Sequence, residues 1–81
     1  MDILTELQPI FRDIFDDESI TVTNESSPEN MEDWDSLVQV RLVMAISRHF
    51  GIRFELDEMT RLKNVGEICA LIAEKLAAKN A

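Results

Sequence analysis

Apolar residues recur at spacings of three and four along much of this chain, which is the pattern of amphipathic helices. Residues 3–15 show the pattern first and predict a helix, which Pro9 should distort because proline lacks a backbone N–H. Residues 36–50 are the most apolar stretch and predict the second helix, with Gly51 suited to its left-handed end. We expect the buried stripe of this second helix to consist of Leu37, Val40, Val43, Met44 and Phe50, widened by Leu42 and Ile46.

The second half of the chain continues the helical pattern. Residues 57–62 have room for one or two turns, and residues 65–79 predict the last helix, with Asn64 and Glu67 placed as a capping box. Residues 16–35 show no period and are rich in Asp, Asn and Ser, which predicts a long loop. The few sizeable apolar residues that should pin this loop to the helices are Ile20, Val22, Met31 and Trp34.

These elements predict one all-α domain over residues 1–81. The expected fold is a small bundle of three main helices and one short helix, with the long loop between helices 1 and 2. A chain of this length buries only about 60% of its unfolded surface, so it cannot enclose a deep active site as well as a core. One cysteine (Cys69) and one histidine (His49) exclude the usual zinc sites, and no carboxylate pair suggests acid–base catalysis. We therefore expect neither an enzyme nor a metal centre.

The formal net charge of −8 is unevenly distributed along the chain. Residues 1–36 contain eleven acids and one base, whereas residues 37–81 contain five acids and seven bases. An acidic protein is repelled by polyanions, so we expect no nucleic-acid or membrane partner. The single cysteine fits a reducing compartment, and no basic signal-peptide region opens the sequence. We expect a cytoplasmic monomer.

The sequence Asp35-Ser36-Leu37 stands at the predicted start of the second helix. A short carboxylate at Asp35 can accept a hydrogen bond from the free N–H groups of the first turn. Ser36 would then open the helix with its hydroxyl turned away from the bundle. Because a helix N-terminus carries partial positive charge and unpaired donors, it favours a phosphate attached or bound there.

This motif, followed by Leu42-Val43-Met44-Ala45, resembles the acyl carrier protein family, and the order of helices and loop follows that family across nearly the whole chain. The resemblance implies that a phosphopantetheinyl transferase attaches 4′-phosphopantetheine from coenzyme A to Ser36. Asp35 would help to bind the metal during the transfer, without a resident metal site, and Leu37 would contact the transferase and partner enzymes. The implied partners also include acyl-loading and acyl-processing enzymes, with acyl groups carried as thioesters on the arm.

The chain departs from the family pattern in two places. The family usually has glycine where this chain has Trp34, which could shield or contact the arm. The second helix of the family is typically acidic and docks on basic patches, whereas no acid lies between Ser36 and Phe50 here. We take Trp34, Val38 and Arg41 as docking residues and expect a specialised carrier for polyketide, modified-lipid or surface-polysaccharide assembly.

In the family, acyl chains can enter between the helices. In this chain, the candidates to line such a cavity are Val40, Met44, Ile52, Phe54, Met59, Leu62, Ile68 and Ile72. The alternative for these side chains is an ordinary core position. Two other functions stay open at this point. One is an aminoacyl or peptidyl carrier loaded by an adenylating enzyme, although such carriers usually have His in place of Asp35. The other is an unmodified helical protein-interaction domain.

Overall fold

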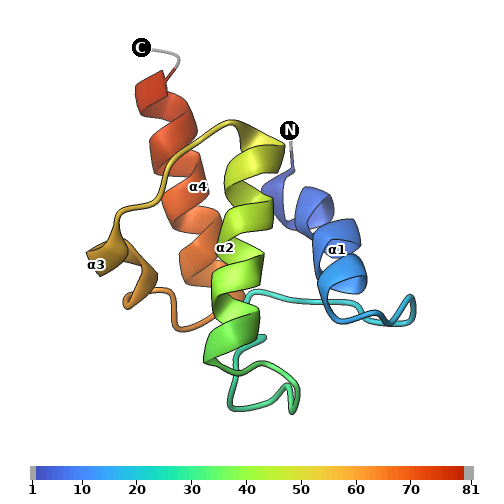
Figure 1. Cartoon of the computed structure of the whole chain (residues 1–81). Coiled ribbons are helices and arrows are strands. Elements are labelled where there is room, and N and C mark those ends of the chain that lie inside the picture. Colours follow the sequence, from blue (N-terminus) through green and yellow to red (C-terminus); the bar gives the residue numbers. More distant parts are fainter. Residues whose placement is uncertain (1, 80–81) are drawn as a thin grey trace.

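Four helices make up the computed structural model, which describes residues 2–79 (Figure 1). They are α1 (Ile3–Ile14), α2 (Ser36–Phe50), α3 (Leu56–Met59) and α4 (Val65–Lys79). Helices α1, α2 and α4 lie side by side as the bundle, and the short α3 sits in the connection between α2 and α4. The predicted all-α fold is confirmed, and the bounds of α2 and α4 agree with the sequence pattern. No helix in the described residues combines the length and apolarity that a membrane span needs.

The first and third helices differ from the prediction at their ends. α1 runs through Pro9 but stops at Ile14, because Asp16 adopts a left-handed φ of 52° directly after the cap residue Phe15. α3 has four residues and not the six predicted over 57–62. It begins one residue earlier because the Glu58 carboxylate accepts a 2.7 Å hydrogen bond from the Glu55 N–H, and it ends in a turn after Met59.

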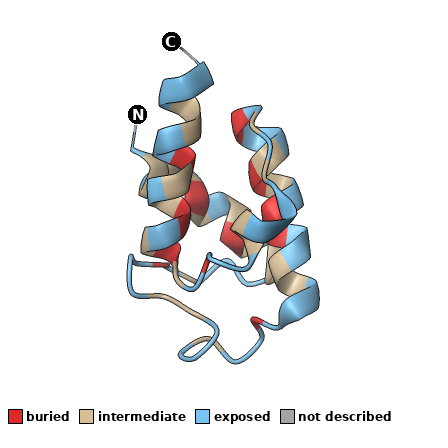
Figure 2. Ribbon diagram, turned by 90° about the vertical axis from the view of Figure 1, so that its left-hand side faces the viewer, coloured by how far each residue is buried: buried red, intermediate tan, exposed pale blue. Residues whose placement is uncertain are grey.

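The core lies between α1, α2 and α4, where the helices turn their buried residues toward one another (Figure 2). Its fully buried side chains include Leu7, Phe11, Leu42, Ile46, Val65, Ile68 and Ile72. On α2 the buried face is made by Leu42, Val43, Ile46 and Phe50. The prediction that Leu37, Val40 and Met44 share this face is wrong: their exposed fractions are 67%, 42% and 57%. These three lie on the opposite side of a helix that is apolar on both sides.

The long loop is held to the helices by side chains and backbone hydrogen bonds. Val22 is 2% exposed, and its backbone makes two hydrogen bonds with the Gln8 side chain. The Val22 N–H donates to the Gln8 oxygen at 2.8 Å, and the Val22 carbonyl accepts from the Gln8 amide nitrogen at 2.9 Å. The carbonyl oxygens of Ser26 and Asn24 accept hydrogen bonds from the first N–H groups of α4, at Val65 and Gly66. The loop therefore supplies the acceptors that the start of α4 lacks.

Candidate functional site

The start of α2 is fixed by its cap residue. Asp35 has extended backbone, and its carboxylate accepts a 2.9 Å hydrogen bond from the Val38 N–H, as the sequence predicts. Ser36 follows as the first helical residue, is exposed, and makes no side-chain hydrogen bond to any described residue. The amide groups of Ser36 and Leu37 also have no hydrogen-bond partner within residues 2–79. The site thus presents one hydroxyl and two free N–H donors at the positive end of the helix dipole.

Trp34, immediately before the cap, is buried with 3% of its surface exposed. Its indole packs edge-on against the rings of Phe11 and Phe15, with centroid distances of 5.4 and 6.4 Å. The indole Nε1–H donates a 2.7 Å hydrogen bond to the Gln39 side-chain oxygen. The prediction that Trp34 is a docking residue needs correction, because a buried indole cannot form an exposed contact surface. Trp34 anchors the loop end from which Ser36 is presented.

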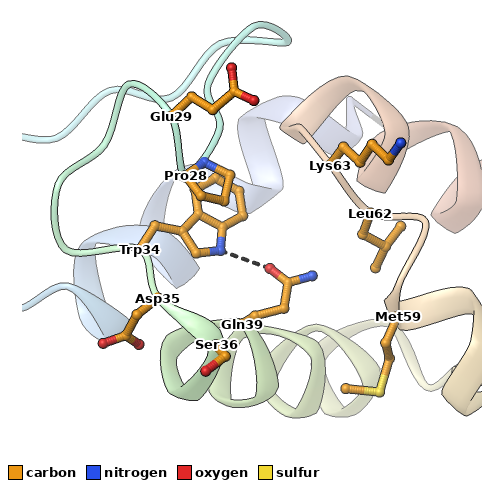
Figure 3. A pocket seen from close by; sticks show the side chains of 9 residues that line it. All are labelled: Pro28, Glu29, Trp34, Asp35, Ser36, Gln39, Met59, Leu62 and Lys63. Carbon is orange, nitrogen blue, oxygen red and sulfur yellow. Dashed lines mark hydrogen bonds between the residues drawn. The ribbon is translucent and has the colours of Figure 1, made fainter.

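A pocket of about 380 Å³ opens beside Ser36, between the loop, the start of α2 and the α3 segment (Figure 3). Its lining residues are Pro28, Glu29, Trp34, Asp35, Ser36, Gln39, Met59, Leu62 and Lys63. Met59 and Leu62 belong to the predicted acyl cavity and supply the apolar wall across the pocket from the loop. The loop residues Pro28 and Glu29 were not expected here, because only the fold brings them next to Ser36.

The structure does not gather the remaining cavity candidates around this pocket. Ile68 and Ile72 are 1% and 0% exposed and belong to the closed core. Ile52 and Phe54 are half-buried in the chain segment after α2, where the ammonium group of Lys75 lies 5.5 Å from the Phe54 ring centroid. Placing Val40 and Met44 in a cavity was wrong, because α2 turns both toward solvent.

The other predicted contact residues lie on α2. Leu37 and Arg41 are exposed, and Val38 is half-buried against the core. Leu37 directly follows Ser36, so a protein that reaches the serine hydroxyl also meets its apolar side chain. No acidic residue lies in the first turn of α2, and the carboxylate at its N-terminus is that of the cap residue Asp35, which accepts the Val38 N–H.

The residues around Ser36 fit a covalently attached phosphate group. The hydroxyl is accessible, the free amides of Ser36 and Leu37 can donate to phosphate oxygens, and the capped helix points its positive end at the same place. The pocket at Met59 and Leu62 offers apolar surface to a flexible group joined at that point. The arrangement thus presents an acceptor hydroxyl for a modification.

Known proteins similar to this chain carry a phosphate-linked group. A family model described as "Phosphopantetheine attachment site" matches residues 6–72. The chain is similar to the solution NMR structure of a holo acyl carrier protein from Geobacter metallireducens, with a TM-score of 0.89 and 44% sequence identity. That match covers 98% of this chain and 91% of the other. A search of curated protein sequences finds no match.

Proposed function

This chain belongs to the acyl carrier protein family, carries a phosphopantetheine arm and is not an enzyme; from this premise we propose that Ser36 is the residue that bears the arm. The observation that carries the proposal is the exposed Ser36 hydroxyl at the Asp35-capped N-terminus of α2. When attached, the arm supplies a thiol on which acyl groups are carried as thioesters.

The residues of this chain position the attachment point and leave the chemistry to other enzymes. Asp35 holds the first turn in shape, so the Ser36 hydroxyl and the free amides of Ser36 and Leu37 keep a fixed relation. Those amides and the helix dipole stabilise the negative charge that the modification brings. Leu37, 67% exposed, gives the transferase and the acyl-processing enzymes an apolar contact beside the serine.

The experiment is intact-mass measurement after incubation with coenzyme A, Mg²⁺ and a broad-specificity phosphopantetheinyl transferase. We expect the native chain to gain the mass of one phosphopantetheine group and Ser36→Ala to gain none. Ser47→Ala, which alters another serine of the same helix, is the matched control and should be modified like the native chain. An unmodified native chain would favour a protein-interaction domain, and a modified Ser36→Ala would place the arm elsewhere.

For the pathway, we propose a specialised carrier in polyketide, modified-lipid or surface-polysaccharide assembly. The support is the composition of α2, which contains Arg41, Arg48 and His49 and no acidic residue. Complementary charge speeds productive encounters and misplaced charge slows them. General fatty-acid enzymes should therefore acylate and elongate this carrier more slowly than a carrier with an acidic second helix. Equal turnover of the two carriers would contradict this assignment.

A further inference from the structure

The side-chain amide of Gln39 lies in the pocket beside Ser36, and Trp34 fixes its orientation. The indole Nε1–H can only donate, so the 2.7 Å hydrogen bond requires the oxygen of the Gln39 amide to face Trp34. The amide nitrogen faces the other way, toward the side of the pocket where Met59 and Leu62 lie (Figure 3). Its N–H donors have no acceptor among the residues that the structure describes. The pocket thus contains an oriented donor that the fold itself leaves unused.

The donor lies where the first part of a group attached to Ser36 must pass. Gln39 follows Ser36 by three residues, so the two side chains are neighbours on one face of α2. In the phosphopantetheine arm, the part next to the phosphate contains two geminal methyl groups, a hydroxyl and the carbonyl of the first of two amides. The carbonyl oxygen is an acceptor for the Gln39 N–H, and the methyl groups match the half-buried, apolar Met59 side chain in the same pocket.

The charges around the pocket favour a neutral acceptor over an anionic one. In the lining that the described residues form, the carboxylates of Glu29 and Asp35 outnumber the ammonium group of Lys63. The net charge of −8 on the whole chain adds to the repulsion of any anionic group beyond the phosphate. An amide carbonyl carries no net charge, so it can approach the Gln39 donor without this cost.

We propose that Gln39 is a positioning residue for the arm: its amide donates to the first amide carbonyl of phosphopantetheine and holds the phosphate-proximal half in the pocket. The proposal rests on the proposed function, which attaches the arm at Ser36. Because the arm is tethered on the neighbouring turn of the helix, its high effective concentration populates a contact of one hydrogen bond and the apolar surface of Met59. The thiol half stays mobile. A glycine in place of Trp34 would leave the Gln39 amide free to turn, so Trp34 is what presents its nitrogen to the arm.

The test is nuclear magnetic resonance relaxation of the holo-protein with an arm that is isotope-labelled at both amide nitrogens. We expect the first amide of the arm to have an order parameter above about 0.6, the limit of flexible chain, and the second amide to lie below it. Gln39→Glu keeps an acceptor for Trp34 but removes the N–H donors, so both arm amides should fall below about 0.6. The matched control is Val40→Glu, which adds the same charge at a 42% exposed position outside the pocket and should keep the first amide ordered.

A second measurement needs no variant. The chain has two glutamines, and the Gln8 side chain is already held by the backbone of Leu4 and Val22. Attachment of the arm should shift the side-chain N–H resonances of Gln39 and leave those of Gln8 in place. The inference is overturned if these Gln39 resonances do not move, or if both arm amides are equally mobile in the native holo-protein. It is also overturned if the first amide stays ordered in Gln39→Glu, or if Val40→Glu frees it as fully.

Intact mass before each spectrum separates the two possible failures. A chain that gains no phosphopantetheine contradicts the proposed function. A chain that is fully modified at Ser36 but has an arm that is mobile throughout leaves the proposed function intact and contradicts only the role of Gln39.

Discussion

The indole Nε1–H of Trp34 and the side-chain oxygen of Gln39 are joined by a 2.7 Å hydrogen bond that spans the start of α2. The two residues flank Asp35 and Ser36 in sequence, at the positions that a hydrophobic staple uses before and after a helix cap. Here a hydrogen bond replaces the apolar contact of the staple. Because Trp34 is also wedged against Phe11, the bond ties the attachment serine to the core.

Replacing Gln39 with leucine should destabilise the protein, because the buried Nε1–H of Trp34 would lose its acceptor. An unsatisfied buried donor costs about 1–3 kcal/mol, which corresponds to a fall in Tm of several degrees in a domain of this size. Thermal unfolding followed by circular dichroism measures the change. Gln39→Glu keeps an acceptor at the same place and is the control, so equal losses in both variants would argue against the bond.

Local signals made much of this site predictable. Asp35 and Gly51 mark the ends of α2 by their own chemistry, and the structure has the predicted cap hydrogen bond at one end and a left-handed φ of 65° at the other. Ser36 follows from its place beside that cap. The Trp34–Gln39 bond was missed because Gln39 breaks the apolar staple pattern, although a buried indole normally requires an acceptor.

The buried face of α2 could not be predicted from periodicity, because the helix has apolar residues on both sides. Leu42 and Ile46 face α1 and α4, while Val40 and Met44, at similar spacing, face solvent. Only the packing of the other helices selects one side. The pocket could not be predicted from the sequence for a related reason. Pro28 and Met59 lie together there only because of the path of the long loop and of the connection around α3.

Gly51→Ala should lower the free energy of unfolding by about 1–2 kcal/mol, because an L side chain is strained in the left-handed conformation that ends α2. A Cβ there would also lie 2.8 Å from the Lys79 ammonium group, which now donates a 3.0 Å hydrogen bond to the Gly51 carbonyl. Urea unfolding of Gly51→Ala, alone and with Lys79→Met, separates the two causes. Gly51→Asn should cost less, and a loss as large as that of alanine would contradict the backbone explanation.

The Glu58–Lys75 ion pair should make part of the stability depend on pH. The hydrogen bond from Lys75, joined by that from the Glu55 N–H, lowers the pKa of Glu58 below its ordinary value. Because the pKa of Glu58 is lowered in the folded state, the ion pair stabilises the protein fully above the unfolded-state pKa of Glu58. This stabilisation is lost as the pH falls through the folded-state pKa. Tm of the native chain should exceed that of Glu58→Gln at about pH 7, and the gap should close toward about pH 3. A gap that stays constant over this range would exclude the linkage.

Cys69 should react slowly with alkylating reagents, so that labelling at neutral pH falls on the thiol of the attached arm. Burial raises the pKa of the Cys69 thiol, and the negative charge of Asp2 raises it further, which leaves less of the reactive thiolate. Brief iodoacetamide treatment of the holo-protein, followed by peptide mapping, measures both positions. Cys69→Ala should not change the labelling rate of the arm, whereas equal labelling of Cys69 and the arm would contradict the prediction.

Asp35 has two separable tasks, and two substitutions distinguish them. Asp35→Ala removes the acceptor of the 2.9 Å hydrogen bond from Val38 N–H, which should cost about 0.5–2 kcal/mol of stability. Asp35→Asn keeps a side-chain oxygen for the cap and should unfold much like the native chain. If the carboxylate also helps to bind the metal during transfer, both variants should be modified at Ser36 more slowly than the native chain.

Initial rates of phosphopantetheine transfer at saturating and limiting Mg²⁺ check that second task. A carboxylate that acts on the metal makes the defect of Asp35→Asn larger when Mg²⁺ is limiting. If Asp35→Asn is modified at the rate of the native chain under both conditions, Asp35 acts only as a helix cap. Because the asparagine variant preserves the helix start, its slow modification could not be attributed to loss of the shape that presents Ser36.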